Sequence, residues 1–249
     1  MIPFFLSEFH TFTKMLFREG VERFTPDVKL YPKEWKTTYF KTYDRSARVI
    51  LPEPVKVNIP YYRLFEKRVS HRSFDTHSDL SSTDISTILH MSTREIDSSV
   101  LEGRGRRPTA SAGARFPLET YILISRNIAE LNRGLYHYRP DLHVLENIYP
   151  LTDETKLDLE KLFIDPIADT YPVIFFVTCV FERSTIKYQD RAYRYILLEA
   201  GAVGQAIQNA ATLLEKRSLI FGGTFDNEVE KFLDIDGVSE SLITTILLK

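Results

Sequence analysis

The sequence predicts a fold of the α+β class, in which helices and strands are mixed along one chain of 249 residues. Residues 173–181 form an apolar run with the length and composition of a buried strand. Residues 191–215 have the apolar spacing of a long helix. The strand and helix patterns follow no βαβ rhythm and no internal repeat is present, so α+β is the class. The length allows one substantial core with an attached arm.

Residues 1–60 are predicted to form an N-terminal helix followed by an extended arm. Ser7 is a suitable N-cap for a helix whose aromatic and apolar residues share one face, namely Phe9, Phe12, Leu16 and Phe17. Between residues 25 and 60, five prolines interrupt regular structure: Pro26, Pro32, Pro52, Pro54 and Pro60. Residues 61–249 are predicted to form the main domain.

The main domain is predicted to contain helices and strands in irregular order. A helix begins at Thr83, with Ile85, Ile88 and Leu89 on one face. Further along the chain we expect a strand at 120–124, a hairpin of 135–138 and 143–148, an amphipathic helix at 153–163, the buried strand at 173–181 and the long helix at 191–215. The strand-like residues 219–221, a short helix opened by Asp226 and a strand at 242–248 complete the domain.

The long helix is rich in small residues, among them Ala200, Gly201, Ala202, Gly204, Ala206, Ala210 and Ala211. Each glycine costs such a helix about 1 kcal/mol relative to alanine. This composition indicates that something large and flat packs close to the backbone, either another helix or a planar ligand.

Composition excludes several classes of partner. The 32 Lys and Arg against 34 Asp and Glu give a formal charge of −2, so nothing demands a nucleic acid or an anionic membrane. No apolar run is long enough to span a bilayer, and the N-terminus lacks the basic region of a signal peptide, so a cytoplasmic location is expected. The single cysteine, Cys179, lies in an apolar segment and is expected to be buried. No metal site is expected.

Three stretches could carry chemistry. In the first, Arg68, Ser70 and Arg72 alternate, so an extended backbone would point all three side chains the same way, an arrangement suited to a phosphate monoester. A solvated basic loop is the alternative interpretation. Charge-assisted bonds of this kind contribute about 1.5–3 kcal/mol each.

The second stretch is a loop of small residues, 109–114, between Pro108 and Pro117. Backbone amides in such a loop can approach the edge of a ligand, although a plain loop would have the same composition. In the third stretch, Lys187 and Tyr188 precede the long helix and could form an acid/base pair, since burial can lower the pKa of a lysine. A solvated helix start with amphipathic tyrosines is the alternative interpretation.

The order and spacing of these stretches resemble the SagB-type branch of the FMN-dependent nitroreductase-like family. The matching residues are Arg68-x-Ser70-x-Arg72, Ser111-Ala112-Gly113-Ala114 with Pro117-Leu118-Glu119, Gly134-Leu135-Tyr136-His137-Tyr138 with Pro140, Lys187-Tyr188 through Glu199-Ala200-Gly201, and finally Asp226, Val229, Leu233 and Asp236. The resemblance extends from about Arg63 to the C-terminus.

The resemblance implies a nitroreductase-like fold, a mixed sheet flanked by helices, with FMN at a homodimer interface. By position, Arg68, Ser70 and Arg72 would hold the FMN phosphate, and Ser111, Ala112 and Gly113 would line the edge of the isoalloxazine. Gln205 occupies a family position on the long helix, and the backbone at Gly222 and Gly223 would pass near the flavin. Lys187 and Tyr188 match the pair proposed in the family to take the substrate proton.

Members of this branch are known as azoline dehydrogenases, which oxidise thiazolines and oxazolines in peptides to thiazoles and oxazoles. The resemblance therefore implies a peptide substrate, a hydride passed from substrate to flavin, and a cyclodehydratase complex as partner. The sequence departs from the family at Ala202, Ala206 and Arg115-Phe116, which leaves the substrate open. The alternatives are an NAD(P)H-using reductase of a small molecule and a flavin-less structural subunit of a peptide-modifying complex.

Overall fold

The computed structural model describes residues 8, 9, 11, 13, 14, 30–72, 75–101, 104–152 and 161–249. Most of the two helices predicted at residues 7–17 and 153–163 therefore lies outside the described residues. None of the described helices is long and apolar enough to cross a membrane.

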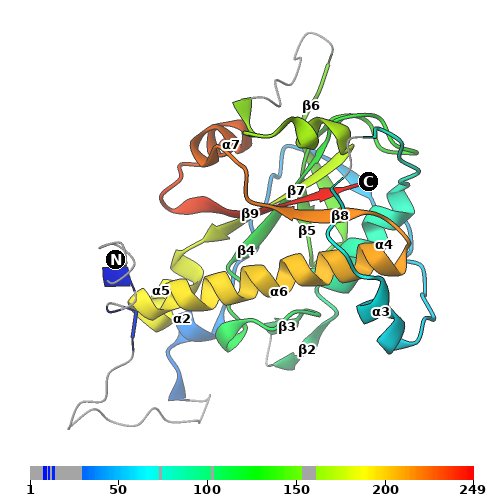
Figure 1. Ribbon diagram of the computed structural model, residues 1–249. Coiled ribbons are helices and arrows are strands. Elements are labelled where there is room, and N and C mark those ends of the chain that lie inside the picture. The colour runs from blue at the N-terminus through cyan, green and yellow to red at the C-terminus, as the bar shows by residue number, and fades with distance from the viewer. Residues whose placement is uncertain are drawn as a thin grey trace.

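The centre of the molecule is a seven-stranded sheet with the strand order β1-β6-β5-β4-β7-β9-β8 (Figure 1). The strands are β1 (Ala47–Ile50), β4 (Leu118–Ile124), β5 (Gly134–Arg139), β6 (Val144–Pro150), β7 (Val173–Val180), β8 (Ser218–Phe221) and β9 (Glu240–Leu248). Each neighbouring pair in this sheet is antiparallel. The expected mixed sheet is thus wrong in this respect: β4, β5 and β6 follow one another through connections too short for the crossover that parallel strands need.

Strands β4 and β7 form the middle of the sheet and are buried on both faces. Their apolar runs are continuous rather than alternating because each face meets its own core. Ile122 lies opposite Phe175, and both enter the core that includes helices α4 and α6. Their neighbours Tyr121 and Phe176 enter the core on the other face, which includes helix α7. The molecule is therefore built of three layers, with the sheet between helices.

The helices that form the outer layers are α4 (Ser82–Ser92) and α6 (Ala192–Leu213) on one face and α7 (Asp226–Leu233) on the other. Three short helices, α2 (Lys33–Lys36), α3 (Tyr61–Lys67) and α5 (Glu182–Tyr188), lie near the two ends of α6 (Figure 1). Strands β2 (Asp97–Leu101) and β3 (Arg104–Arg106) form a separate two-stranded sheet.

Most of the elements predicted in the main domain are confirmed. Helix α4 begins within one residue of the prediction, because Ser81 and Asp84 form a reciprocal capping box at its start. The predicted hairpin corresponds to β5 and β6, and the buried strand to β7. Cys179 is buried within β7, and this burial raises the pKa of its thiol, as expected of a small hydrophobic residue.

Strand β1 lies inside the segment assigned to the arm, yet it is an edge strand of the main sheet. Val49 pairs with Leu145 of β6 in antiparallel register. Strand β1 was not predicted, because a four-residue segment among prolines gains its regular structure from the neighbouring strand rather than from its own composition.

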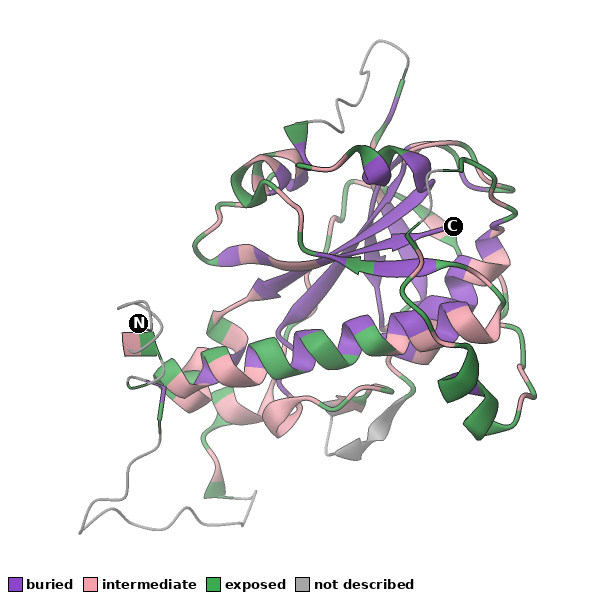
Figure 2. Cartoon of the chain, in the orientation of Figure 1, coloured by how far each residue is buried: buried purple, intermediate pink, exposed green. Residues whose placement is uncertain are grey.

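Helix α6 has one buried side and one open side. Ala200, Ala210 and Ala211 are buried in the core that α6 shares with α4, so these small residues serve helix packing. Gly201 and Gln205 face outwards, and Figure 2 shows the exposed patches along this helix. A Cβ atom added at Gly201 would meet no atom within 4 Å, so α6 is open at this position.

Candidate active site

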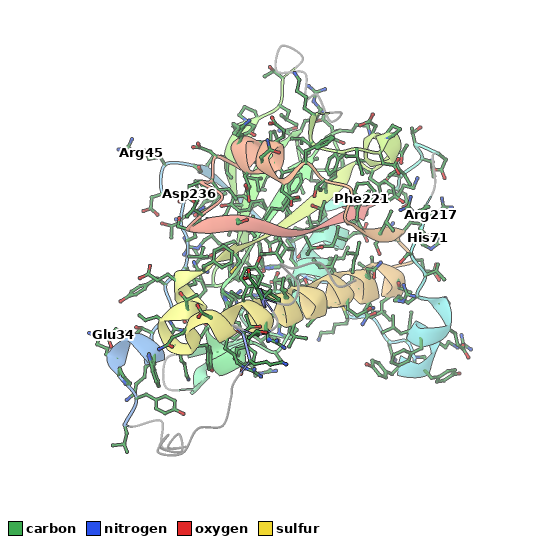
Figure 3. The ribbon with its side chains drawn as sticks, turned by 60° about the vertical axis from the view of Figure 1, so that its left-hand side comes forward. Glu34, Arg45, His71, Arg217, Phe221 and Asp236 are labelled. Carbon is green, nitrogen blue, oxygen red and sulfur yellow. The ribbon has the colours of Figure 1, made fainter. Side chains whose placement is uncertain are left out.

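The predicted site residues form two clusters near opposite ends of α6. The loop cluster comprises Ser111, Ala112, Gly113, Lys187 and Tyr188, and the arginine cluster comprises Arg68, Ser70 and Arg72. Figure 3 labels Glu34 of α2, near the N-terminal end of α6, and His71, between Ser70 and Arg72 of the arginine cluster, near the C-terminal end of α6. From Glu199, which contacts the loop cluster, to Leu213, α6 rises by about 21 Å. One chain therefore does not bring the two clusters together.

The loop cluster is centred on Gly113. Its φ of 62° is in the left-handed region that favours glycine. A Cβ atom at this position would overlap the Tyr188 hydroxyl and lie 3.0 Å from Lys187 Nζ. The loop and the Lys187-Tyr188 pair thus come together in the structure, 74 residues apart in the chain. The absence of a Cβ atom at Gly113 lets both polar groups approach the loop backbone.

Lys187 and Tyr188 are the last two residues of α5, which follows directly after β7. Gln189, with a φ of 48°, ends this helix. The ring of Tyr188 packs edge to face against Tyr195 of α6, with the ring centroids 5.0 Å apart. The Nζ atom of Lys187 lies 4.6 Å from the centroid of the Tyr31 ring.

The loop after Gly113 is conformationally strained. Ala114 and Phe116 have φ values of 51° and 43°, which side chains other than glycine rarely adopt. The Ser111 hydroxyl accepts a hydrogen bond from the Phe116 backbone N–H at 2.8 Å and so closes the loop. The Arg107 guanidinium stacks over the Phe116 ring, 4.6 Å from its centroid. Such strain is typical of functional loops that the surrounding structure fixes.

Glu199 of α6 is a buried carboxyl within the Glu199-Ala200-Gly201 motif. Burial raises its pKa to about 7, although a hydrogen bond with Ser111 and the charge of Arg107 act in the opposite direction. Glu199 shares the buried side of α6 with Ile196, Ala200 and Val203. An acidic residue at helical spacing within an apolar face is the sequence signal that could have identified it.

The arginine cluster follows helix α3 in an extended segment beside β8. The backbone N–H of His71 donates to the carbonyl of Ser218 at 3.0 Å, and the Tyr171 hydroxyl donates to the His71 carbonyl. Ser70 and Arg72, on either side of His71, are exposed. Arg72 Nη1 lies 3.5 Å from Asp165 Oδ2 in a solvent-exposed ion pair. The segment is therefore anchored at its centre, with polar side chains accessible to a ligand.

The remaining predicted cofactor residues lie along α6 and after β8. Gln205 is exposed on α6, and its Nε2 donates to Asn209 Oδ1 at 2.7 Å. Gly222 is open, because a Cβ atom there would meet nothing within 4 Å. A Cβ atom at Gly223 would instead overlap the Phe221 ring and lie 3.0 Å from Ile164. Packing within the protein alone thus accounts for the glycine at position 223.

A buried ionic network links strands β4, β5 and β6, and no local sequence pattern indicates it. The His137 imidazole lies between two carboxylates, 2.9 Å from Glu119 and 3.2 Å from Glu146. Burial alone would lower the pKa of His137, but hydrogen bonds with both carboxylates outweigh it and raise the pKa. Arg183 of α5 lies 2.5 Å from Glu119 and ties the network to the helix that carries Lys187.

A cavity of about 700 Å³ lies beside α5, between this helix and the segment 33–41. Its charged walls include Lys41, Arg115, Arg183 and Glu240. Lys41 is paired with Glu240 at 2.5 Å, and Arg115 donates to the carbonyl of Thr37 at 2.8 Å. The described residues that line it include none of the predicted site residues.

Comparison with curated proteins gives three relatives. The nitroreductase-family protein MJ1384 of Methanocaldococcus jannaschii is 33% identical over 141 residues, which are 55% of this chain and 68% of that protein. The trifolitoxin-processing protein TfxB of Rhizobium leguminosarum is 28% identical over 72% of this chain and 49% of its own length. The microcin B17-processing protein McbC of Escherichia coli is 29% identical over 54% of this chain and 50% of its own length. The chain thus matches about half the length of the two peptide-processing relatives.

Solved structures share the fold at low sequence identity. A nitroreductase-family structure from Anabaena variabilis has a TM-score of 0.70 at 24% identity, covering 97% of this chain and 45% of that chain. A chain of the Escherichia coli microcin synthetase McbBCD complex, with truncated pro-MccB17 bound, has a TM-score of 0.60 at 20% identity. The match covers 98% of this chain and 91% of that chain. A nitroreductase-family structure from Desulfovibrio desulfuricans in complex with FMN has a TM-score of 0.51 at 15% identity. The match covers 77% of this chain and 86% of that chain.

The sequence pattern of the Nitroreductase family matches residues 65–247, the part of the chain that includes both clusters, helix α6 and all but the first strand of the sheet. The fold, the order of the predicted site residues along the chain and the family pattern agree, and the chain belongs to the nitroreductase family of oxidoreductases.

Proposed function

We propose that this protein is an FMN-dependent azoline dehydrogenase, which oxidises thiazolines or oxazolines in a peptide to thiazoles or oxazoles. The observation that carries the proposal is the meeting of Lys187 Nζ and the Tyr188 hydroxyl at the backbone of Gly113. An amine and a phenol at one position of a ligand-binding loop suit proton transfer. The relatives named as processing proteins of microcin B17 and trifolitoxin support a peptide as the substrate.

The residues of both clusters fit FMN. The arginine cluster offers two guanidinium groups and a hydroxyl for a phosphate, and Gly201 and Gly222 leave space for a planar ring. Since one chain holds the clusters near opposite ends of α6, a homodimer would supply the complete site. In an isologous pair, the arginine cluster of one chain can face the loop cluster of the other.

The chemistry that bound FMN would supply in this mechanism is acceptance of the hydride from the ring Cβ of the azoline. Lys187 Nζ takes the proton from the ring Cα, and the electron pair of that C–H bond forms the new double bond. The Tyr188 hydroxyl, beside Nζ at Gly113, orients the amine and the ring. Proton and hydride together account for the two hydrogens lost by the substrate.

The proposed setting is a complex with a cyclodehydratase, which forms the azoline that this enzyme would oxidise. The microcin synthetase complex supports this assembly as an analogy. A partner protein would read any leader peptide of the substrate, and the reaction would take place in the cytoplasm, where peptide and FMN are available.

Substitution of the proposed acid/base pair tests the proposal. Lys187→Ala and Tyr188→Phe should retain bound FMN and stay yellow, but lose turnover of an azoline peptide by about 10²–10⁴-fold, since general acid/base catalysis contributes this much. The double variant should lose less than the product of the single losses if the residues act as a unit. Mass spectrometry of a synthetic azoline peptide, incubated with any partner cyclodehydratase, measures the loss of two hydrogens.

Two results would contradict this proposal in different ways. Full activity in both variants would place the base elsewhere. If the unaltered protein never oxidises azolines but consumes NAD(P)H with a nitroaromatic, the reductase function would replace the dehydrogenase.

A further inference from the structure

We propose that Tyr31 and Trp35 are positioning residues for Lys187, and that together with Tyr188 they form an aromatic box around its Nζ atom. The box would hold Nζ over the loop at Gly113 and stabilise the positive charge that Nζ gains on taking a proton. The inference rests on the proposed function in assigning Lys187 the role of base, whereas the box itself stands on the geometry.

Three rings surround the amine. Nζ of Lys187 lies 4.6 Å from the centroid of the Tyr31 ring, 5.5 Å from that of Trp35 and 5.3 Å from that of Tyr188. All three distances are within the range of cation–π attraction. Tyr31 and Trp35 also pack edge to face, with centroids 5.6 Å apart, so each fixes the other.

The box is built across a long stretch of the chain. Tyr31 and Trp35 belong to the segment at α2, whereas Lys187 and Tyr188 end α5. Tyr31 and Trp35 are four residues apart and reach the same amine, while Lys33, Glu34 and Thr37 of the same segment line the 700 Å³ cavity. Helix α2 therefore contacts Lys187 on one side and lines the cavity on another.

The chemistry of the box favours the transition state over the ground state. Aromatic faces attract a cation but offer little to a neutral amine. As Nζ takes the ring proton, its charge grows while the rings are already in place, so their attraction increases along the reaction. Such differential stabilisation raises kcat rather than lowering KM.

Kinetics of single variants in the FMN-loaded full chain test the role. Trp35→Ala should lower kcat for an azoline peptide by about tenfold, the effect expected for loss of one half-buried cation–π partner, and leave KM unchanged. Tyr31→Ala should act in the same direction. Trp35→Phe and Tyr31→Phe should retain most of kcat, because a ring face remains. Tyr39→Ala, in the same segment but 78% exposed, is the matched control and should keep full activity.

Fluorescence tests the contact without turnover. Trp35 is the single tryptophan of the chain, so its emission reports the box alone. Lys187→Met should change the intensity or wavelength of Trp35 emission, because a thioether replaces the amine beside the indole. Lys33→Met, a lysine of the same helix on the cavity side, should leave the emission unchanged.

The outcomes separate the two proposals. Unchanged Trp35 emission in Lys187→Met would overturn the box, as would full kcat in Trp35→Ala with its native circular dichroism retained. If the unaltered chain oxidises no azoline, the proposed function fails, and the emission of Lys187→Met against Lys33→Met still decides whether the box exists.

Discussion

At the scale of single residues, Glu199 has the most unusual environment near the loop cluster. It is only 6% exposed, and its pKa is raised from 4.5 to about 7. A carboxyl whose pKa is higher in the folded than in the unfolded protein binds its proton more tightly when folded. Its contribution to stability is therefore present below pH 4.5 and is lost as the pH rises through 7.

The raised pKa of Glu199 predicts that the free energy of unfolding depends on pH differently in Glu199→Gln and in the unaltered protein. The free energy of unfolding of the variant, relative to the unaltered protein, should increase by up to about 3 kcal/mol between pH 4.5 and pH 8. Urea unfolding at several pH values measures it. Glu215→Gln, at an exposed position beyond the same helix, should show no such trend. A flat difference for Glu199→Gln would mean that the carboxyl is ionised in the folded state.

The arginine cluster is predicted to bind the FMN phosphate. Arg68→Ala and Arg72→Ala should each weaken FMN binding by about 10–100-fold, since each removes a charge-assisted partner. Asp165→Asn should keep or strengthen binding, because it releases Arg72 from its ion pair while an amide oxygen can still cap residues 166–170. Quenching of FMN fluorescence gives the affinities.

Arg45→Ala is the matched control for these variants, because Arg45 is exposed and lies far from His71 in Figure 3. If Arg68→Ala and Arg72→Ala bind FMN as tightly as Asp165→Asn, Arg45→Ala and the unaltered protein, the phosphate lies elsewhere.

At the scale of elements, the loop around Gly113 and helix α5 must fit each other. Gly113→Ala should reduce azoline turnover much more than it reduces stability, because a Cβ atom would displace the Tyr188 hydroxyl and Lys187 Nζ. The neighbouring Ala114→Gly makes a matched comparison: its φ of 51° already suits glycine, so relief of about 1 kcal/mol of strain offsets the flexibility gained on unfolding.

Thermal unfolding and turnover of both loop variants measure the two effects separately. Full turnover in Gly113→Ala would show that the loop and the pair do not work together.

At the scale of the whole molecule, the separation of the two clusters leads to the predicted homodimer. Light scattering should give about twice the 28.9 kDa mass of one chain. The open side of α6 carries Leu198, 72% exposed, beside Leu197 and Gly201. An apolar group so exposed is typical of an interface. Leu198→Glu should therefore weaken the dimer and FMN binding together.

The control for the dimer is Val238→Glu, at an exposed position in the turn before β9. It should change neither the mass nor FMN binding. A monomer that binds FMN as tightly as the unaltered protein would overturn the shared site.

The sequence by itself determined the fold class, the main helices and strands of the domain and the candidate site residues. Local pattern was sufficient for these, since the apolar run of β7, the spacing in α4 and the small residues of α6 follow directly from what each face buries. The motif order was sufficient to indicate the family, because residue types and spacings can be compared without coordinates.

Only the tertiary structure decided which of these residues meet. The antiparallel sheet, edge strand β1, the network around His137 and the box around Lys187 all depend on contacts between distant segments, which no local pattern encodes. The same holds for the distance between the arginine cluster and the loop cluster, which the length of α6 sets. Glu199 illustrates the reason: its residue type was visible in the sequence, but its raised pKa depends on burial by elements far along the chain.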